Sequence, residues 1–174
     1  MPSFQKVAGE GIRMHLDQDE ARLLRELLKE MKLLLEADIP QTDAVKERLF
    51  PAAYEDTQRA EEFREMVGGD LMQGKLAALH SVSERVGRKG PLETSIPEDE
   101  VTAWLTLLTD LRLAIGTRLE VDDETMEHEI DPNDPRAPAL SVLHWLGWVQ
   151  GSILEVLDGD YYQQGEEGAA GTGQ

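Results

Sequence analysis

Apolar residues recur three or four positions apart over most of the chain, which is the spacing of helices with one buried face. The clearest example follows Asp17, a good N-cap, and Glu20, which completes the sequence pattern of a capping box. Its apolar stripe consists of Leu24, Leu27, Leu28, Met31, Leu34 and Leu35. The pattern therefore predicts a helix from Asp17 to about Ala37.

Two further helical segments follow. A short helix is expected to open at Thr42 or Asp43 and to stop at Pro51, because proline disfavours helical geometry in the residue before it. The helical pattern resumes over 57–86, but the adjacent glycines Gly68 and Gly69 weaken it in the middle. We expect two helices, or a kink, in this segment.

The last third of the chain predicts two more helices. Pro97 suits the first turn of a helix, and the apolar pattern carries that helix to about Leu119. An acidic, proline-containing loop at 122–138 separates it from a final helix over about 138–157.

Short segments at 4–8, 10–16 and 91–96 have the character of strands. The first two flank a glycine-containing turn and predict an antiparallel hairpin, to whose edge the third can add. The expected fold is mainly α, a bundle of about five helices with a small two- or three-stranded antiparallel sheet. We expect one domain over 1–158 and a disordered acidic, glycine-rich tail over 159–174.

The chain is strongly acidic, with 35 Asp and Glu residues against 17 Lys and Arg and a formal net charge of −18. Such a charge repels phosphate and anionic lipid, so neither direct DNA binding by the chain alone nor a membrane role is expected. No signal-peptide core is visible at the N-terminus, which favours the cytoplasm. The absence of cysteine excludes disulfides and thiol chemistry within the chain.

No motif of catalysis, cofactor binding or metal binding stands out. The four histidines have no metal-ligand spacing, and no phosphate-binding glycine loop is present. Carboxylates crowd the stretch VDDETMEHEIDPNDP at 121–135, but it lacks the required glycine of a calcium loop. We therefore expect no catalytic residue, no cofactor and no metal ion, and we interpret this loop as a solvated run of charge.

Arg112 falls inside the apolar arc of its helix, while Asp110 points away from that arc. A buried arginine needs a partner, so we expect Arg112 to be paired to a carboxylate or to several backbone carbonyls. The alternative is a ligand site, in which Arg112 binds the carboxylate or phosphate of a small molecule.

Two surfaces are candidates for interaction. On the first long helix a basic strip lies beside the apolar stripe, either as a salt-bridged solvent face or as a contact for an acidic partner protein or a nucleic-acid backbone. On the final helix a second face lies off the core stripe and is expected to contact another segment of the fold or a second copy of the chain in a homodimer. The strip consists of Arg22, Arg25, Lys29 and Lys32, and the second face of His144, Trp148, Gly151 and Glu155.

The stretches WLTLLTDLRLAIGTRLEV at 104–121 and HWLGWVQGSILEVL at 144–157 closely resemble an actinobacterial family known mostly as a domain of unknown function. The hairpin, DEARLLRELL at 19–28 and DLMQGKLAAL at 70–79 also fit, so the resemblance covers nearly the whole chain before the tail.

The family includes AosR-type transcriptional regulators of oxidative stress, and its members are typically encoded beside the adaptor that feeds substrates to the Clp protease. The resemblance implies a non-enzymatic regulatory protein that acts through protein contacts with the transcription machinery, or an interaction module in Clp-linked protein turnover. A third reading is a small-ligand-binding domain. The cysteine pair that serves redox sensing in AosR-type members has no counterpart here, because this chain has no cysteine.

Overall fold

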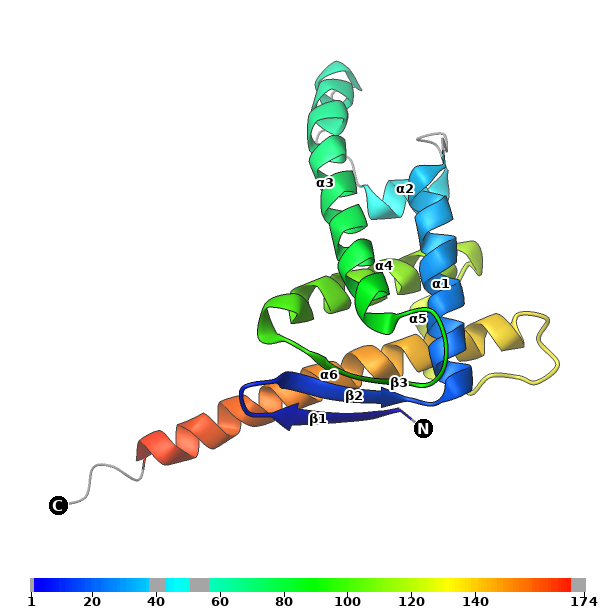
Figure 1. Cartoon of the computed structure of the whole chain (residues 1–174). Coiled ribbons are helices and arrows are strands. Elements are labelled where there is room, and N and C mark those ends of the chain that lie inside the picture. The colour runs from blue at the N-terminus through cyan, green and yellow to red at the C-terminus, as the bar shows by residue number, and fades with distance from the viewer. Residues whose placement is uncertain (1, 38–42, 51–56, 170–174) are drawn as a thin grey trace.

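The computed structural model describes residues 2–37, 43–50 and 57–169, with side chains throughout except at 57–69, 127 and 160–169. The described residues form a mainly helical fold with a small antiparallel sheet, as the sequence predicted (Figure 1). The strands are β1 (Ser3–Val7), β2 (Gly11–Leu16) and β3 (Leu92–Ile96), and the helices are α1 (Gln18–Glu36), α2 (Ala44–Leu49), α3 (Thr57–Val86), α4 (Val101–Arg118), α5 (Asp123–Glu127) and α6 (Ala137–Ala169), with a 3-10 turn, η1 (Glu98–Glu100), before α4.

The sheet has the order β1-β2-β3 with both pairs antiparallel, so the third strand joins the hairpin beside β2. Residues on one face of β2 are buried in alternation, as the period of a strand requires. Ile12 lies opposite Ile96, and Leu16 lies opposite Leu92, which places apolar pairs of neighbouring strands on the core face. α6 runs along the sheet and continues past it (Figure 1).

The predicted capping box at the start of α1 is confirmed. The Asp17 carboxylate accepts hydrogen bonds from the backbone N–H groups of Asp19 and Glu20, both at 2.9 Å, and the Glu20 carboxylate accepts one from the Asp17 N–H at 2.9 Å. The Asp43 carboxylate caps α2 by accepting hydrogen bonds from the backbone N–H groups of Val45 and Lys46. The alternative start at Thr42 lies outside the described residues, as does the predicted loop at 51–56.

Of the two alternatives for 57–86, that of two separate helices was wrong, because α3 is continuous through Gly68 and Gly69, while a kink stays a prediction. Each glycine weakens a helix interior by only about 1 kcal/mol relative to alanine, and helical residues flank the pair on both sides. The last turns of α3 bury Leu79, Val82 and Val86 in the core. The packing of these last turns in the core stabilises α3 by more than the two glycines destabilise it.

α4 crosses the middle of the fold and packs against α2, α3 and α6 (Figure 1). It begins later than predicted, because the chain makes the 3-10 turn η1 between β3 and Val101. Its buried residues are Val101, Trp104, Leu107, Leu108, Asp110, Leu111 and Ala114. This buried arc is wider than a single stripe, since neighbours cover α4 on more than one side.

The region after α4 differs from the sequence prediction in two respects. The acidic loop contains the short helix α5, which the pattern did not indicate. The predicted end of the last helix at Leu157 was too early, because α6 continues to Ala169, and the stretch predicted as a tail begins inside it. Residues 170–174 lie outside the described residues.

The segment Ala137–Gly159 of α6 is long and apolar enough to cross a membrane by length and composition alone. Core helices of soluble proteins pass the same test, and this helix buries Leu140, Leu143, Leu146, Val149 and Ile153 inside the fold.

An ion pair ties three elements together at the end of the sheet. Arg85 of α3 donates from Nε to Oε2 of Glu100 at 2.6 Å and from Nη2 to Oε1 at 2.7 Å, and its Nη1 reaches the carbonyl of Ser95 at 3.1 Å. The hydrogen bonds from Arg85 hold the pKa of Glu100 below its ordinary value of 4.5. Glu100 thus favours its charged form in the folded state.

We predict that Gly11→Ala destabilises the protein far more than Gly9→Ala. Both glycines have positive φ, 92° and 78°, which costs an alanine about 1 kcal/mol. A Cβ at Gly11 would also overlap the backbone oxygen of Ile96, whereas a Cβ at Gly9 meets nothing within 4 Å. Urea unfolding should give an extra loss of about 3 kcal/mol for Gly11→Ala. Equal losses would contradict the close packing of β2 on β3.

We predict that the Arg85–Glu100 pair makes stability depend on acid pH. Because the folded pKa of Glu100 is lowered, its contribution is complete above the unfolded value near 4.5 and is lost as pH falls through the lower folded pKa. The unfolding free energy of the wild type should therefore fall more steeply below pH 4.5 than that of Glu100→Gln. Parallel pH profiles for the two proteins would contradict this assignment.

Candidate functional site

Arg112 is half-buried, and its partner differs from the one predicted. Its Nη1 donates to the amide oxygen Oε1 of Gln150 on α6 at 2.9 Å, and no carboxylate or backbone carbonyl of the described residues accepts from it. The Nε atom is buried without a hydrogen-bond partner. The guanidinium lies 3.6 Å from where a Cβ would stand on Gly147, so the missing side chain gives it room. Arg112 thus carries a charge that no described acid neutralises.

The prediction of a carboxylate partner for Arg112 was wrong because the arginine lies at the edge of the core. Leu105 and Ile115, which share its arc, are themselves only half-buried. The buried arc of α4 extends away from Arg112 instead, past Leu111 to Asp110 and Ala114.

Asp110 is the one buried charged residue found in the described part of the chain, with 6% of its surface exposed. Lys75 of α3 reaches both of its carboxylate oxygens, at 2.8 and 2.9 Å. The Lys75 ammonium also lies 5.7 Å from the centre of the Phe50 ring, which adds a cation–π contact. Sequence analysis missed this pair and placed Asp110 on the outer side of the helix.

A second apolar stripe was the signal for Asp110. Leu107 lies three positions before Asp110 and Ala114 lies four positions after it, which is the spacing of one helix face. Only a helix covered on two sides uses both stripes, and the sequence alone does not say which helices are covered in this way.

Residues far apart in sequence form a basic surface, in which the start of α1 meets the turn between α3 and β3. This basic cleft is a hollow of about 360 Å³ lined by Arg22, Arg25, Lys29, Arg88 and Lys89, with Gln18, Gly90 and the single acid Glu26. The structure therefore joins most of the predicted basic strip to the Arg88-Lys89 pair. Lys32 is exposed but does not line the hollow.

Arg25 has a structural role within the basic cleft. Its guanidinium donates to the backbone carbonyls of Val86, Gly87, Lys89 and Gly90 at 3.1, 3.3, 3.2 and 2.8 Å. Arg25 thereby fixes the turn that carries Arg88 and Lys89. Arg25 thus binds several backbone carbonyls, which was one of the two kinds of partner predicted for Arg112.

The other lining bases differ in how they are neutralised. Arg22 pairs with Asp19 at 2.8 Å on the same helix. Lys29, Arg88 and Lys89 are exposed, and no carboxylate in the described residues pairs with them. Three unneutralised cations thus surround a hollow in a chain whose net charge is −18.

The second face of α6 contacts another segment of the same chain. The Trp148 ring lies 6.0 Å from the Phe4 ring of β1, at an interplanar angle of 57°. Trp148 still exposes 46% of its surface. His144 and Gly151 are half-buried and Glu155 is exposed, so this face is partly covered by the sheet. A second copy of the chain in contact with Trp148 stays a prediction.

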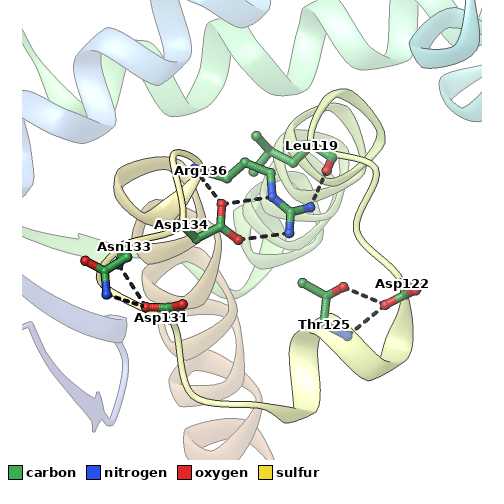
Figure 2. Close-up of polar contacts among 7 residues, drawn as sticks. All are labelled: Leu119, Asp122, Thr125, Asp131, Asn133, Asp134 and Arg136. Atoms are coloured by element: carbon green, nitrogen blue, oxygen red, sulfur yellow. Dashed lines mark hydrogen bonds and ion pairs between the residues drawn. The ribbon is translucent and has the colours of Figure 1, made fainter.

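Three carboxylates of the acidic loop, those of Asp122, Asp131 and Asp134, accept hydrogen bonds from nearby residues (Figure 2). Asp122 accepts from the N–H and hydroxyl of Thr125 at 2.7 and 2.6 Å. Asp134 accepts from Nε and Nη2 of Arg136 at 3.2 and 3.0 Å, while Nη1 of Arg136 reaches the carbonyl of Leu119 at 2.9 Å. The donated bonds from Thr125 lower the pKa of Asp122, and those from Arg136 lower the pKa of Asp134.

These contacts orient the carboxylates of the loop toward their own backbone and toward Arg136. Among the residues described by the structure, no group of three or more His, Asp or Glu side chains is placed to hold a metal ion.

A family model matches residues 1–157 of the chain. The chain belongs to the family described as DUF2017, a domain of unknown function. The match spans the sheet, the basic cleft and Arg112, together with α6 as far as Leu157. No curated protein matches the chain, and no solved structure matches it.

We predict that Asp110→Ala costs far more stability than Arg112→Ala. Removal of Asp110 leaves the Lys75 ammonium in a site where its side chain exposes only 12% of its surface, which costs roughly 3 kcal/mol or more. Removal of Arg112 takes away one hydrogen bond to a neutral amide, which contributes about 1 kcal/mol.

Chemical denaturation of both variants measures the difference. The control is Asp19→Ala, whose partner Arg22 is exposed, and a loss of about 1 kcal/mol at most is expected there. A loss for Asp110→Ala no larger than that of the control would show that the Lys75–Asp110 pair does not support the fold.

Proposed function

We propose that this protein is a non-enzymatic regulator that acts by binding an acidic segment of a partner protein in the basic cleft. The observation that carries the proposal is the convergence of Lys29, Arg88 and Lys89, unneutralised and exposed, on one hollow of a chain with net charge −18. Charges placed in this way steer association and select partners of opposite sign.

The rigidity of the cleft supports binding. Arg25 ties the turn of Arg88 and Lys89 to α1 through its bonds to backbone carbonyls. A preformed site loses less conformational entropy on binding than a flexible one. The backbone positions that carry Lys29, Arg88 and Lys89 are therefore held relative to one another before a partner arrives.

The size of the cleft favours a short acidic protein segment over duplex DNA. A duplex carries one negative charge per about 1.7 Å, and its length would bring it near the acidic remainder of the surface. An acidic segment of a few residues meets the local cations only. The isolated chain is therefore expected not to bind duplex DNA appreciably at physiological salt.

The resemblance to AosR-type regulators supports a partner in the transcription machinery, such as RNA polymerase or a sigma factor, and hence an actinobacterial stress response in the cytoplasm. The usual gene neighbourhood of the family supports the alternative, a contact with Clp components in protein turnover. In either case the cysteine-free chain transmits no thiol signal of its own.

The test is affinity capture from native cells with the full chain as wild type, Lys29→Glu and Arg88→Glu, read by quantitative mass spectrometry. Each reversal puts a like charge against an acidic partner, so capture should fall about tenfold or more. RNA polymerase or a sigma factor among the lost proteins supports the first reading, and Clp components support the alternative.

Lys32→Glu is the matched control. It makes the same charge change on the same helix at an exposed residue outside the cleft, and it should retain the partner. Equal loss in the control would assign the effect to net charge. Unchanged capture by Lys29→Glu and Arg88→Glu, or submicromolar binding of duplex DNA by the isolated wild type, would overturn the proposal.

A further inference from the structure

One side of α4 forms the floor of a groove that the basic cleft does not include. The groove has a volume of about 400 Å³. Residues 109, 112, 113, 116, 117 and 120 of α4 and the residues just after it, spaced as one helix face, lie along it. Arg48 of α2, Met126 of α5 and Leu143 of α6 complete the walls. Sites for small ligands are typically concave spaces of roughly 300–1,000 Å³ with mainly apolar walls.

Neither arginine of this groove is paired with a carboxylate of the described residues. Arg112 is half-buried, its single hydrogen bond goes to the neutral amide of Gln150, and its Nη2 donates to no described residue. Arg48 is exposed and pairs with no carboxylate in the described part of the chain. A partly buried guanidinium without a counter-charge is unfavourable, and a bound anion would relieve that cost.

Apolar and hydrogen-bonding groups accompany the two arginines. Leu113, Val121, Met126 and Leu143 line the groove, and a Cβ added at Gly116 would meet nothing within 4 Å. Thr109 lines the groove too, and its hydroxyl accepts from the Gln150 amide at 2.7 Å. The same amide group thus orders both Thr109 and Arg112.

We propose that this groove binds a small amphipathic anion, with its carboxylate or phosphate at Arg112 and Arg48 and its apolar body along α4. Glu120 lines the groove just beyond the last residue of α4, eight residues after Arg112 in the sequence. This carboxylate repels an anionic head and so sets the direction in which the ligand lies. The site is independent of the proposed protein contact, since the two hollows share no lining residue.

Isothermal titration calorimetry of the full chain with octanoate and with monooctyl phosphate tests the proposal. Both probes have the required anionic head and a short apolar tail. The probe that binds with the higher affinity identifies the head group that the site prefers. Binding in the micromolar to submillimolar range is expected. Arg112→Gln should weaken it by about tenfold, and Arg48→Gln by a smaller factor.

Two controls distinguish binding at this site from nonspecific electrostatic attraction and from nonspecific hydrophobic binding. Arg118→Gln removes an exposed arginine of the same helix that lines a different hollow, and its affinity should equal that of the wild type. Octylamine, with the same tail and the opposite charge, should not bind. Circular dichroism checks that each variant is folded. Absence of binding by both anions, equal binding of octylamine, or unchanged affinity in folded Arg112→Gln would overturn the proposal.

Discussion

The burial of α4 on more than one side is the constraint on which the rest of the structure depends. α2, α3 and α6 all pack against this helix, so its surface must be apolar over a wide arc. Asp110 interrupts that arc and is tolerated because Lys75 reaches both of its oxygens. The ion pair fixes how α3 lies on α4, since a slide of either helix would leave a buried charge alone. The remaining side of α4 is left to solvent, and there the groove forms.

Two groups of cations among the described residues have opposite effects on stability. Lys75, Arg85 and Arg136 pair with carboxylates, and Arg25 caps the end of α3, so these side chains hold elements together. Lys29, Arg88 and Lys89 pair with no described carboxylate and cost stability through mutual repulsion. The pairs of the first group already hold the elements together, so the fold has no structural need for the second group.

Local rules were sufficient for most elements of the fold. Helix α1 was predicted from its cap and stripe, and the sheet from alternation and the turn glycines, because their determinants lie within a few residues. The Gly68-Gly69 pair misled the prediction because propensity is weak beside tertiary packing. For the same reason, Asp110 was predicted on the exposed side of α4 and Arg112 in its buried arc, whereas the structure buries Asp110 and leaves Arg112 half-buried. A prediction from one apolar stripe holds when neighbours cover one face of the helix. The number of covered faces of α4 depends on the helices that pack against it.

The basic cleft likewise depends partly on local sequence and partly on tertiary packing. The basic strip on α1 was visible in the sequence, whereas its junction with Arg88 and Lys89 depends on where α3 ends and turns. Arg25 makes that junction, because one guanidinium binds four carbonyls of the turn. A residue that seemed part of a solvent-exposed strip therefore builds the cleft, while its neighbours are free to act in it. Substitution of Arg25 would disturb the fold and the proposed binding site together, so only substitutions of the unpaired bases around it can separate the two effects.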